Sequence, residues 1–372
     1  MAVKSNVVRK PNATLTLNGE TVPGLLSCEV DNNNFYAADE FRATLVLSKG
    51  KPWDFWASTP GIRAVIKMGE AGDEQHVITG EIDRCTTDPV ANLVQINGRD
   101  LSCSLIDNRT RKTFNNFRVH NVAEYLADRH GLAAVVTETK QIYAGPELNN
   151  SSSEIDVGPS HWDLLTYLAQ QTGRVLYVDK ETLYFVSEED LVREPYPLVW
   201  QGGPAGGGNP RAPVMRLELE RNLVLAQRVV VEILSYDVQA GTPIVATAES
   251  SANIPITDER GRRRFKQVYS REIPDLNAAQ ANARARQLLE DITRHERRIR
   301  FVAPGDSELT VRSLIKLSGT GTSYDQEYYP DHIVRRWSAD RGYTMRVRAK
   351  NHSPATVVSV GGIELTPVAS GD

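Results

Sequence analysis

The stretch SHWDLLTYLAQQTGRVLYVDKETLYFV, Ser160–Val186, has the pattern of a capped helix followed by a two-stranded hairpin. Ser160 can accept a backbone N–H at the start of a helix, and Asp163, three residues later, can bond back to it. Apolar residues follow at helical spacing, and Gly173 stands where a left-handed residue ends a helix. Alternating residues on either side of Asp179–Glu181 then predict a hairpin. Packing explains every feature of this unit without a catalytic group.

A similar unit precedes it by about forty residues. Asn121–Glu124 can act as a capping box, Gly131 ends the helix, and Leu132–Thr137 reads as a strand. Two such units packed together predict a small α+β domain over residues 106–190.

Short strands dominate the chain before this region. Asn18-Gly19 is a strong hairpin signal. Alternating strands at Ile62–Met68, His76–Ile82 and Leu93–Asn97 follow without an intervening helix. This spacing predicts an antiparallel barrel or sandwich over residues 1–105.

The second half repeats the β pattern after a break. Residues 201–213 contain five glycines and three prolines, so residues 191–213 are predicted to be a linker or surface loop. They lack GxxxxGK[ST], which argues against a phosphate-binding loop. Residues 214–350 are predicted to form another β domain carrying one long inserted helix at 277–294, and residues 351–372 a terminal arm. The predicted fold class is therefore mainly β with α+β.

Composition excludes several classes of protein. The 372 residues are 40% hydrophobic and 24% charged, with a net charge of −4, which is typical of globular proteins and not of nucleic-acid-binding domains. No apolar run is long enough to span a membrane, and the N-terminus lacks a signal-peptide core, which predicts folding in a cytoplasm. Cys28, Cys85 and Cys103 lack CxxC spacing, which argues against a disulfide framework or a zinc site.

Two short motifs resemble known sites of chemistry. Gly305-Asp306-Ser307 is similar to an esterase nucleophile motif, but it leads into a strand, and Asp331-His332 are adjacent instead of spaced. His295-Glu296 lacks the second histidine of HExxH, and Arg297-Arg298 would repel a metal ion. The sequence therefore predicts no catalytic, cofactor-binding or metal-binding residues, and no cofactor.

The basic cluster Arg260–Lys266, RGRRRFK, leaves two interpretations open. Arginines with an interleaved aromatic ring can hold phosphates and stack on bases. The same composition suits an exposed loop that pairs with an acidic neighbouring subunit.

Several stretches, in their order along the chain, together resemble the central baseplate hub proteins of phage tails. This is the late control D and Mu-type hub family, related to the N-terminal part of type VI secretion spike proteins. The stretches are Ile78–Ile82 with Gly98–Leu101, Trp162–Val186, Ala303-Pro304-Gly305 with the strand that follows, and Tyr329–Arg348.

The resemblance implies a non-enzymatic virion structural protein, a baseplate or tail-tip hub assembled in the host cytoplasm. Such hubs contain a pair of tube-type antiparallel β-barrels in one chain, which the resemblance implies for residues 1–105 and 214–350. They are trimers that join a hexameric tail tube to a trimeric central spike or tip. The implied partners are the tail tube protein, the spike or tip protein and other baseplate proteins, with DNA only in transit through the channel and no membrane insertion. Some members of the family carry cysteine-bound iron–sulfur clusters or fused lytic domains, but neither is expected in this chain.

Two alternatives stay open at this point. One is a tail-associated cell-wall hydrolase with an acidic dyad in the 106–190 region. The other is the equivalent hub of a phage-like contractile injection particle. An enzyme should show a cleft with convergent carboxylates of perturbed pKa, whereas a hub should show large flat interfaces.

Overall fold

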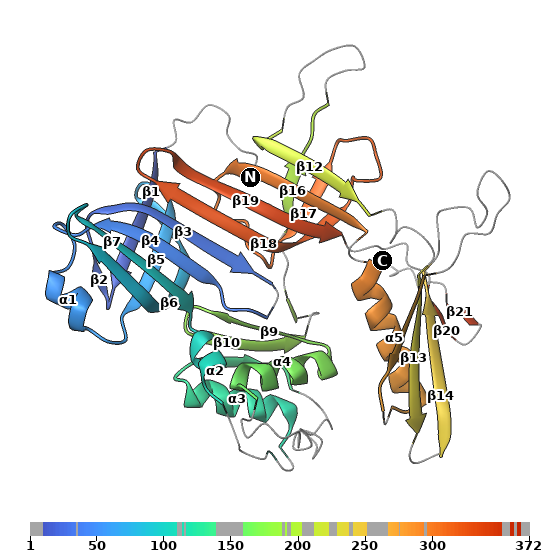
Figure 1. Cartoon of the computed structure of the whole chain (residues 1–372). Helices are drawn as coiled ribbons and strands as arrows, with labels where there is room; N and C mark the ends of the chain where they lie inside the picture. The colour runs from blue at the N-terminus through green and yellow to red at the C-terminus, as the bar shows by residue number, and fades with distance from the viewer. Residues whose placement is uncertain are drawn as a thin grey trace. The chain divides into compact units, whose positions relative to one another are not determined.

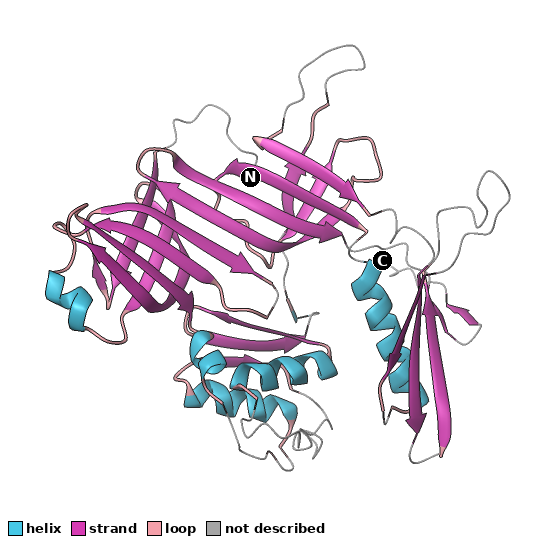
Figure 2. Ribbon diagram, viewed as in Figure 1, coloured by secondary structure: helices cyan, strands magenta, loops and turns pink. Residues whose placement is uncertain are grey.

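The computed structural model describes most of the chain. The described residues are 10–34, 36–109, 114, 117–138, 159–187, 190–191, 195–202, 212–222, 229–237, 241–250, 267–274, 276–293, 296–351, 358–360 and 363–365. Figure 1 shows these parts coloured along the chain, and Figure 2 shows that strands predominate.

The chain divides into two compact units, each built from separated stretches of sequence. The first unit comprises Met1–Glu194, Val302–Ser313 and Asp331–Val347. The second comprises Pro195–Phe301, Leu314–Pro330 and Arg348–Asp372. Neither unit is therefore a continuous segment of the chain.

The first unit is built on antiparallel strands. From the N-terminus they are β1 (Pro11–Leu17), β2 (Glu20–Thr21), β3 (Leu25–Asn33), β4 (Glu40–Val46), β5 (Arg63–Glu70), β6 (Asp73–Asp88) and β7 (Leu93–Asp100), with the short helix α1 (Trp53–Ser58) between β4 and β5. Two late strands, β18 (Glu327–Ser338) and β19 (Gly342–Asn351), complete the set. The strand order is β19-β18-β3-β4-β7-β6-β5-β1-β2.

Alternation of apolar residues gives this sheet its buried face. Leu15 and Ile66, opposite each other on β1 and β5, are fully buried in one core cluster. Trp337 and Tyr343, from the late strands, belong to the same cluster. The Asn18-Gly19 turn between β1 and β2 has positive φ at both residues, which confirms the predicted hairpin.

The α+β part of the first unit begins after β7. It contains α2 (Cys103–Asp107), α3 (Val119–Arg129), β8 (Ala133–Val136), α4 (His161–Thr172), β9 (Arg174–Asp179) and β10 (Thr182–Ser187). Its sheet has the order β8-β10-β9, with β8 parallel and β9 antiparallel to β10. Figure 1 shows α3 and α4 side by side along this sheet.

The predicted start and end of α4 are confirmed. Asp163 N donates to Ser160 Oγ at 3.0 Å, Ser160 N donates to Asp163 Oδ2 at 3.3 Å, and Gly173 has a φ of 64°. The capping box predicted at Asn121–Glu124 is wrong, because α3 already begins at Val119, after an Arg118 that makes no side-chain cap.

The second unit contains strands of the large sheet and a separate α+β layer. The sheet strands are β11 (Pro195–Val199), β12 (Arg216–Arg221), β16 (Arg297–Pro304) and β17 (Leu314–Ser318). The layer, called the insert below, consists of β13 (Val229–Asp237), β14 (Thr242–Glu249), β15 (Gln267–Glu272) and α5 (Ala278–Thr293). A C-terminal hairpin, β20 (Val358–Val360) and β21 (Ile363–Leu365), ends the described chain, and β20 contacts β14.

Two fold predictions need correction. The expected pair of barrels is not present among the described residues, which instead form one thirteen-stranded sheet whose end strands, β2 and β12, do not pair with each other. The inserted helix is confirmed in position, with reciprocal bonds between Asn277 and Gln280 at its start. At 16 residues, however, α5 is a helix of ordinary length and not a long one.

Candidate functional site

The best candidate for a site is a cleft in the first unit, with a volume of about 1350 Å³. Its walls come from the ends of β3, β5 and β6, the β9–β10 turn, the segment 305–312 and the late strands β18 and β19. Seven carboxylates line it, against three cationic side chains. The carboxylates are those of Asp39, Glu70, Asp73, Asp100, Asp179, Asp306 and Glu308.

Asp39 lies in the wall of this cleft and holds the connection between β3 and β4. Its Oδ2 accepts from Asn32 Nδ2 at 2.8 Å, and its Oδ1 accepts from Asn33 N at 2.8 Å. Burial raises the pKa of Asp39, while these hydrogen bonds act in the opposite direction. The carboxylate is therefore committed to organising a turn.

Asp100 ends β7 and prepares the start of α2. Its Oδ1 accepts from Ser102 Oγ at 2.5 Å and from Ser102 N at 3.2 Å. Its backbone N donates to Asp39 O at 2.9 Å. Burial, and then the charge of Asp39, raise the pKa of Asp100 to about 7.

Arg335, on β18, is a buried residue in the wall of the cleft and ties three separated segments together. It donates to Asn32 Oδ1 at 2.6 Å and to the carbonyl oxygen of Leu309. A buried guanidinium needs such acceptors, since an unpaired buried charge is costly. Its position next to Asn32 links β18 to the same turn that Asp39 organises.

Ser307, the serine of the esterase-like motif, also lies in this cleft. Its Oγ donates to Met68 O at 2.9 Å and lies 3.4 Å from Tyr343 Oη. His76 is in the same cleft, but its Nε2 is hydrogen-bonded to Thr79 Oγ1 at 2.8 Å, and burial lowers its pKa. The hydroxyl of Ser307 thus fixes the 305–312 segment against β5, in a setting unlike a nucleophile turn.

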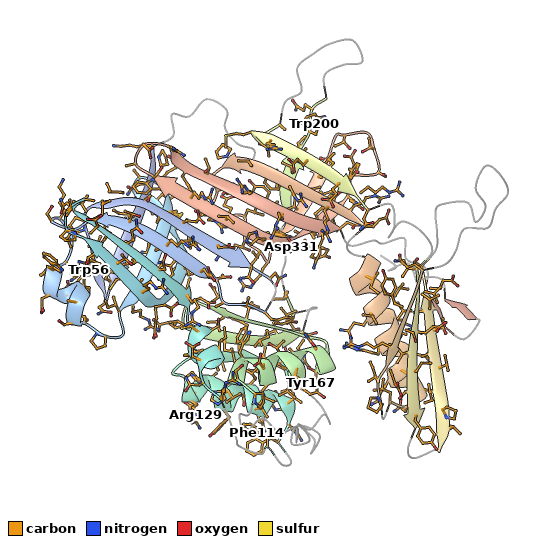
Figure 3. The ribbon with its side chains drawn as sticks, viewed as in Figure 1. Trp56, Phe114, Arg129, Tyr167, Trp200 and Asp331 are labelled. Atoms are coloured by element: carbon orange, nitrogen blue, oxygen red, sulfur yellow. The ribbon has the colours of Figure 1, made fainter. Side chains whose placement is uncertain are left out.

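Two of the remaining sequence candidates have polar partners on neighbouring strands. His332, next to the Asp331 labelled in Figure 3, contacts the carboxylate of Asp31 through its Nε2, and Glu296 Oε1 lies 3.2 Å from Arg221 Nε. His295, the cluster Arg260–Lys266 and residues 203–211 lie outside the described residues.

Two broader searches gave negative results for the part of the chain that is described. It contains no group of three His, Cys, Asp or Glu side chains arranged to hold a metal ion. None of its helices has the length and apolar character needed to cross a bilayer.

A histidine pair was missed by the sequence analysis. His130 Nε2 and His161 Nδ1 lie 2.7 Å apart at the adjoining ends of α3 and α4. Burial lowers both pKa values, that of His161 to about 4, so one neutral ring donates to the other. Only the packing of α3 and α4 brings these two histidines together, so no local pattern in the sequence predicts the pair.

The buried carboxylates differ from the acidic dyad considered in the sequence. Asp39 and Asp100 lie outside residues 106–190, and each already accepts at least two hydrogen bonds from its own neighbourhood. Their pKa values are raised as those of a general acid would be, so the arrangement can hold protons. The prediction that the chain has no catalytic residues stays a prediction.

Comparison with solved structures identifies the architecture. A tail protein from Neisseria meningitidis aligns with a TM-score of 0.66 and 17% identity, over 92% of this chain and 97% of its own. The prophage MuSo2 43 kDa tail protein from Shewanella oneidensis aligns with a TM-score of 0.61 and 14% identity, over 94% and 98%. The chain has the fold of phage tail proteins.

The tail-protein fold extends to secretion machinery. An Escherichia coli component of the type VI secretion system, described as structurally similar to the T4 tail proteins gp27 and gp5, aligns with a TM-score of 0.52 and 12% identity, over 92% of this chain and 77% of its own. No protein-family model and no curated protein sequence matches the chain. The predicted resemblance to tail hubs is therefore confirmed at the level of the fold.

Proposed function

We propose that this chain is a structural hub of a phage-type tail. Three copies would form a ring that joins a hexameric tail tube to a trimeric spike or tip and continues the tail channel. Its place would be the baseplate or tail tip of the virion, after assembly in the host cytoplasm. Other baseplate proteins would bind around the ring, and DNA would pass only in transit.

The observation that carries this proposal is the extent of the structural match. The tail proteins from Neisseria and Shewanella are covered almost end to end by a chain of similar length. A match over both compact units supports a shared structural role better than a match over one module would. The cleft supports the same role, because the side chains of Asp39, Asp100 and Ser307 are used to hold segments together.

Reconstitution tests the proposal. Purified protein should be trimeric by light scattering, alone or after mixing with the tube and spike proteins of the same particle. Electron micrographs of the mixture should place it between tube and spike. A chain that stays monomeric beside both partners would overturn the ring.

A second function is favoured by one observation, the pair of buried carboxylates with raised pKa. A tail-associated hydrolase would use Asp39 or Asp100 as its acid. Purified protein should release neither reducing ends nor free amines from peptidoglycan. Turnover that disappears in Asp39→Asn or Asp100→Asn, but survives in Asp340→Asn at an exposed position, would establish the enzyme instead.

The tail-protein fold is equally compatible with a contractile injection particle. The Escherichia coli relative is described as a component of the type VI secretion system. The same reconstitution applies there, with the tube and spike of that particle in place of those of a phage.

A further inference from the structure

The insert has one face covered by α5 and an opposite face on which several apolar side chains are exposed. On the covered face, Val231 and Ile233 of β13 pack against Ala285 and Leu289 of α5 in one buried cluster. Figure 1 shows α5 running along the same side of β13 and β14. Side chains alternate along a strand, so the neighbouring positions point to the opposite face.

That opposite face, called the outer sheet face below, gathers exposed apolar side chains. Val245 is 64% exposed, Tyr236 and Val268 are each 51% exposed, and Leu234 is 38% exposed. Register places Leu234 directly opposite Val245, and Tyr236 opposite Pro243. Contiguous apolar surface of this kind marks an interaction site in a soluble protein.

Strand direction strengthens this point. β13 pairs with β15 in parallel, with Val230 opposite Val268. Parallel pairs are ordinarily covered on both faces, because their crossovers place other elements there. In the insert, α5 covers one face; β20 contacts β14, and Val230 is buried, but Leu234, Tyr236, Val245 and Val268 are left exposed. A further layer is therefore expected over these four side chains of the outer sheet face.

The charged residues of the outer sheet face indicate what kind of surface would cover it. The outer sheet face carries Glu232, Glu249 and Glu272, and none of its described positions is a lysine or an arginine. Its partner should therefore present cationic side chains together with apolar groups that cover the exposed valine, leucine and tyrosine side chains.

The solvent side of α5 has these properties. Ala279, Ala283 and Arg286 follow one another at helical spacing and are exposed. Arg284, bonded to Gln287 at 2.7 Å, adds a second cation beside them. The acidic residues of α5 come only in its last turn, so the middle of the helix is basic.

We propose that the outer sheet face binds α5 of a second copy of this chain. Each insert sheet would then lie between its own α5 and that of a neighbour. The two surfaces differ, so the contact is head to tail and repeats around a ring. This inference rests on the proposed trimer and names the surface that closes it.

The first test asks whether the outer sheet face is needed for association. Val245→Glu places a carboxylate in an acidic, apolar surface and should weaken trimer formation at least tenfold, as measured by light scattering over a dilution series. Val90→Glu is the matched control, because Val90 is 98% exposed and lies far along the chain from the insert. Circular dichroism should be unchanged in both variants.

The second test asks which surface is on the other side. Val245→Cys and Ala283→Cys are prepared as separate single variants, mixed, and treated with a short bis-maleimide. The mixture should give a cross-linked dimer that neither variant gives alone, and the double variant should give a covalent trimer. Mixing Val90→Cys with Ala283→Cys should give none.

The outcomes separate this inference from the function on which it rests. A trimer that survives Val245→Glu and gives no cross-link would overturn the assigned surface while leaving the hub intact. A trimer that survives but no longer binds its spike would show that the face serves another protein, which also overturns the assignment. A chain that stays monomeric beside tube and spike would overturn the hub itself.

Discussion

At the scale of single residues, the glycines of β6 and β7 explain why one of the family-like motifs has the residues it has. A Cβ at Gly98 would lie 2.1 Å from Glu81 O and 2.4 Å from the Phe41 ring. A Cβ at Gly80 would lie 2.0 Å from Arg99 O. The pairing of β6 with β7 shifts register between Ile82 and Arg84, and the two backbones approach closely beside this bulge.

Gly98→Ala is therefore expected to be destabilising. The methyl group meets backbone and a buried ring that cannot both move away, which costs about 1–3 kcal/mol of unfolding free energy. Urea denaturation measures the difference. The control is Gly50→Ala, where the nearest atom would lie at an ordinary 3.4 Å. Equal stability of the two variants would mean that β6 and β7 separate readily.

Asp100 gives a prediction about pH. Burial raises its pKa to about 7, whereas an aspartate in an unfolded chain has a pKa of about 3.9. Between these values the folded chain holds a proton that the unfolded chain has lost. The contribution of Asp100 to the free energy of unfolding therefore falls as the pH rises from 4 to 7.

Asp100→Asn should remove this loss, because the amide oxygen can still accept from Ser102. We expect the variant to be at least as stable as the native chain at pH 8 and to lose that advantage at pH 4.5, in urea denaturation at both values. Asp340→Asn is the control of opposite sign, since a bond from Ser338 lowers the pKa of that exposed carboxyl. If the effect of Asp100→Asn on the free energy of unfolding did not depend on pH, the raised pKa of Asp100 in the folded chain would be refuted.

At the scale of elements, the start of α4 depends on one hydroxyl. Ser160→Ala removes the acceptor of the Asp163 N–H and should cost about 1 kcal/mol. Ser187→Ala is the control, because Ser187 bonds to Thr137 through its backbone N. Its effect should stay within about 0.5 kcal/mol. Equal shifts of the urea midpoint in the two variants would show that the Ser160 hydroxyl does not stabilise the start of α4.

The elements that the sequence analysis placed correctly are those with local signals. The cap at Ser160, the stop at Gly173, the Asn18-Gly19 turn and the Asn277–Gln280 box all act within a few residues. The prediction of two barrels was wrong because it depends on contacts between distant parts of the chain. Closure of a sheet depends on which distant strands become neighbours, and no short pattern encodes that β18 pairs with β3.

The candidate cleft was missed on the same grounds. Asn32, Asp39, Asp100 and Arg335 come from four places in the sequence, and only the folded chain brings them to one wall. Each is an ordinary residue in its own stretch. The serine motif at 305–307 could be noticed from sequence, and the structure adds the bond to Met68 that gives it a structural explanation.

At the scale of the whole molecule, the chain passes several times between the two units, so that each unit is made of three separated stretches. The first unit takes residues up to Glu194 and then returns for Val302–Ser313 and Asp331–Val347. The returning strands are not peripheral, since Trp337 donates its indole N–H to Pro11 O at 3.3 Å and lies in the core cluster of β1 and β5.

A fragment of residues 1–194 should therefore fail to reach the native state. It would leave the edge of β3 without β18 and the core without Trp337, which favours aggregation. A version that joins residues 331–347 to this fragment through a flexible linker should be more soluble and should unfold cooperatively. Chemical denaturation followed by circular dichroism distinguishes them, and a cooperative transition in the bare fragment would contradict this reasoning.

The late strands also delay the folding of the first unit during translation. At roughly 5–20 residues per second, on the order of ten to thirty seconds separate the synthesis of residue 194 from that of residue 347. During this interval the N-terminal strands wait for partners that have not yet been made. A nascent chain thus cannot present a finished first unit to a growing assembly, so translation itself restricts recruitment to nearly complete molecules.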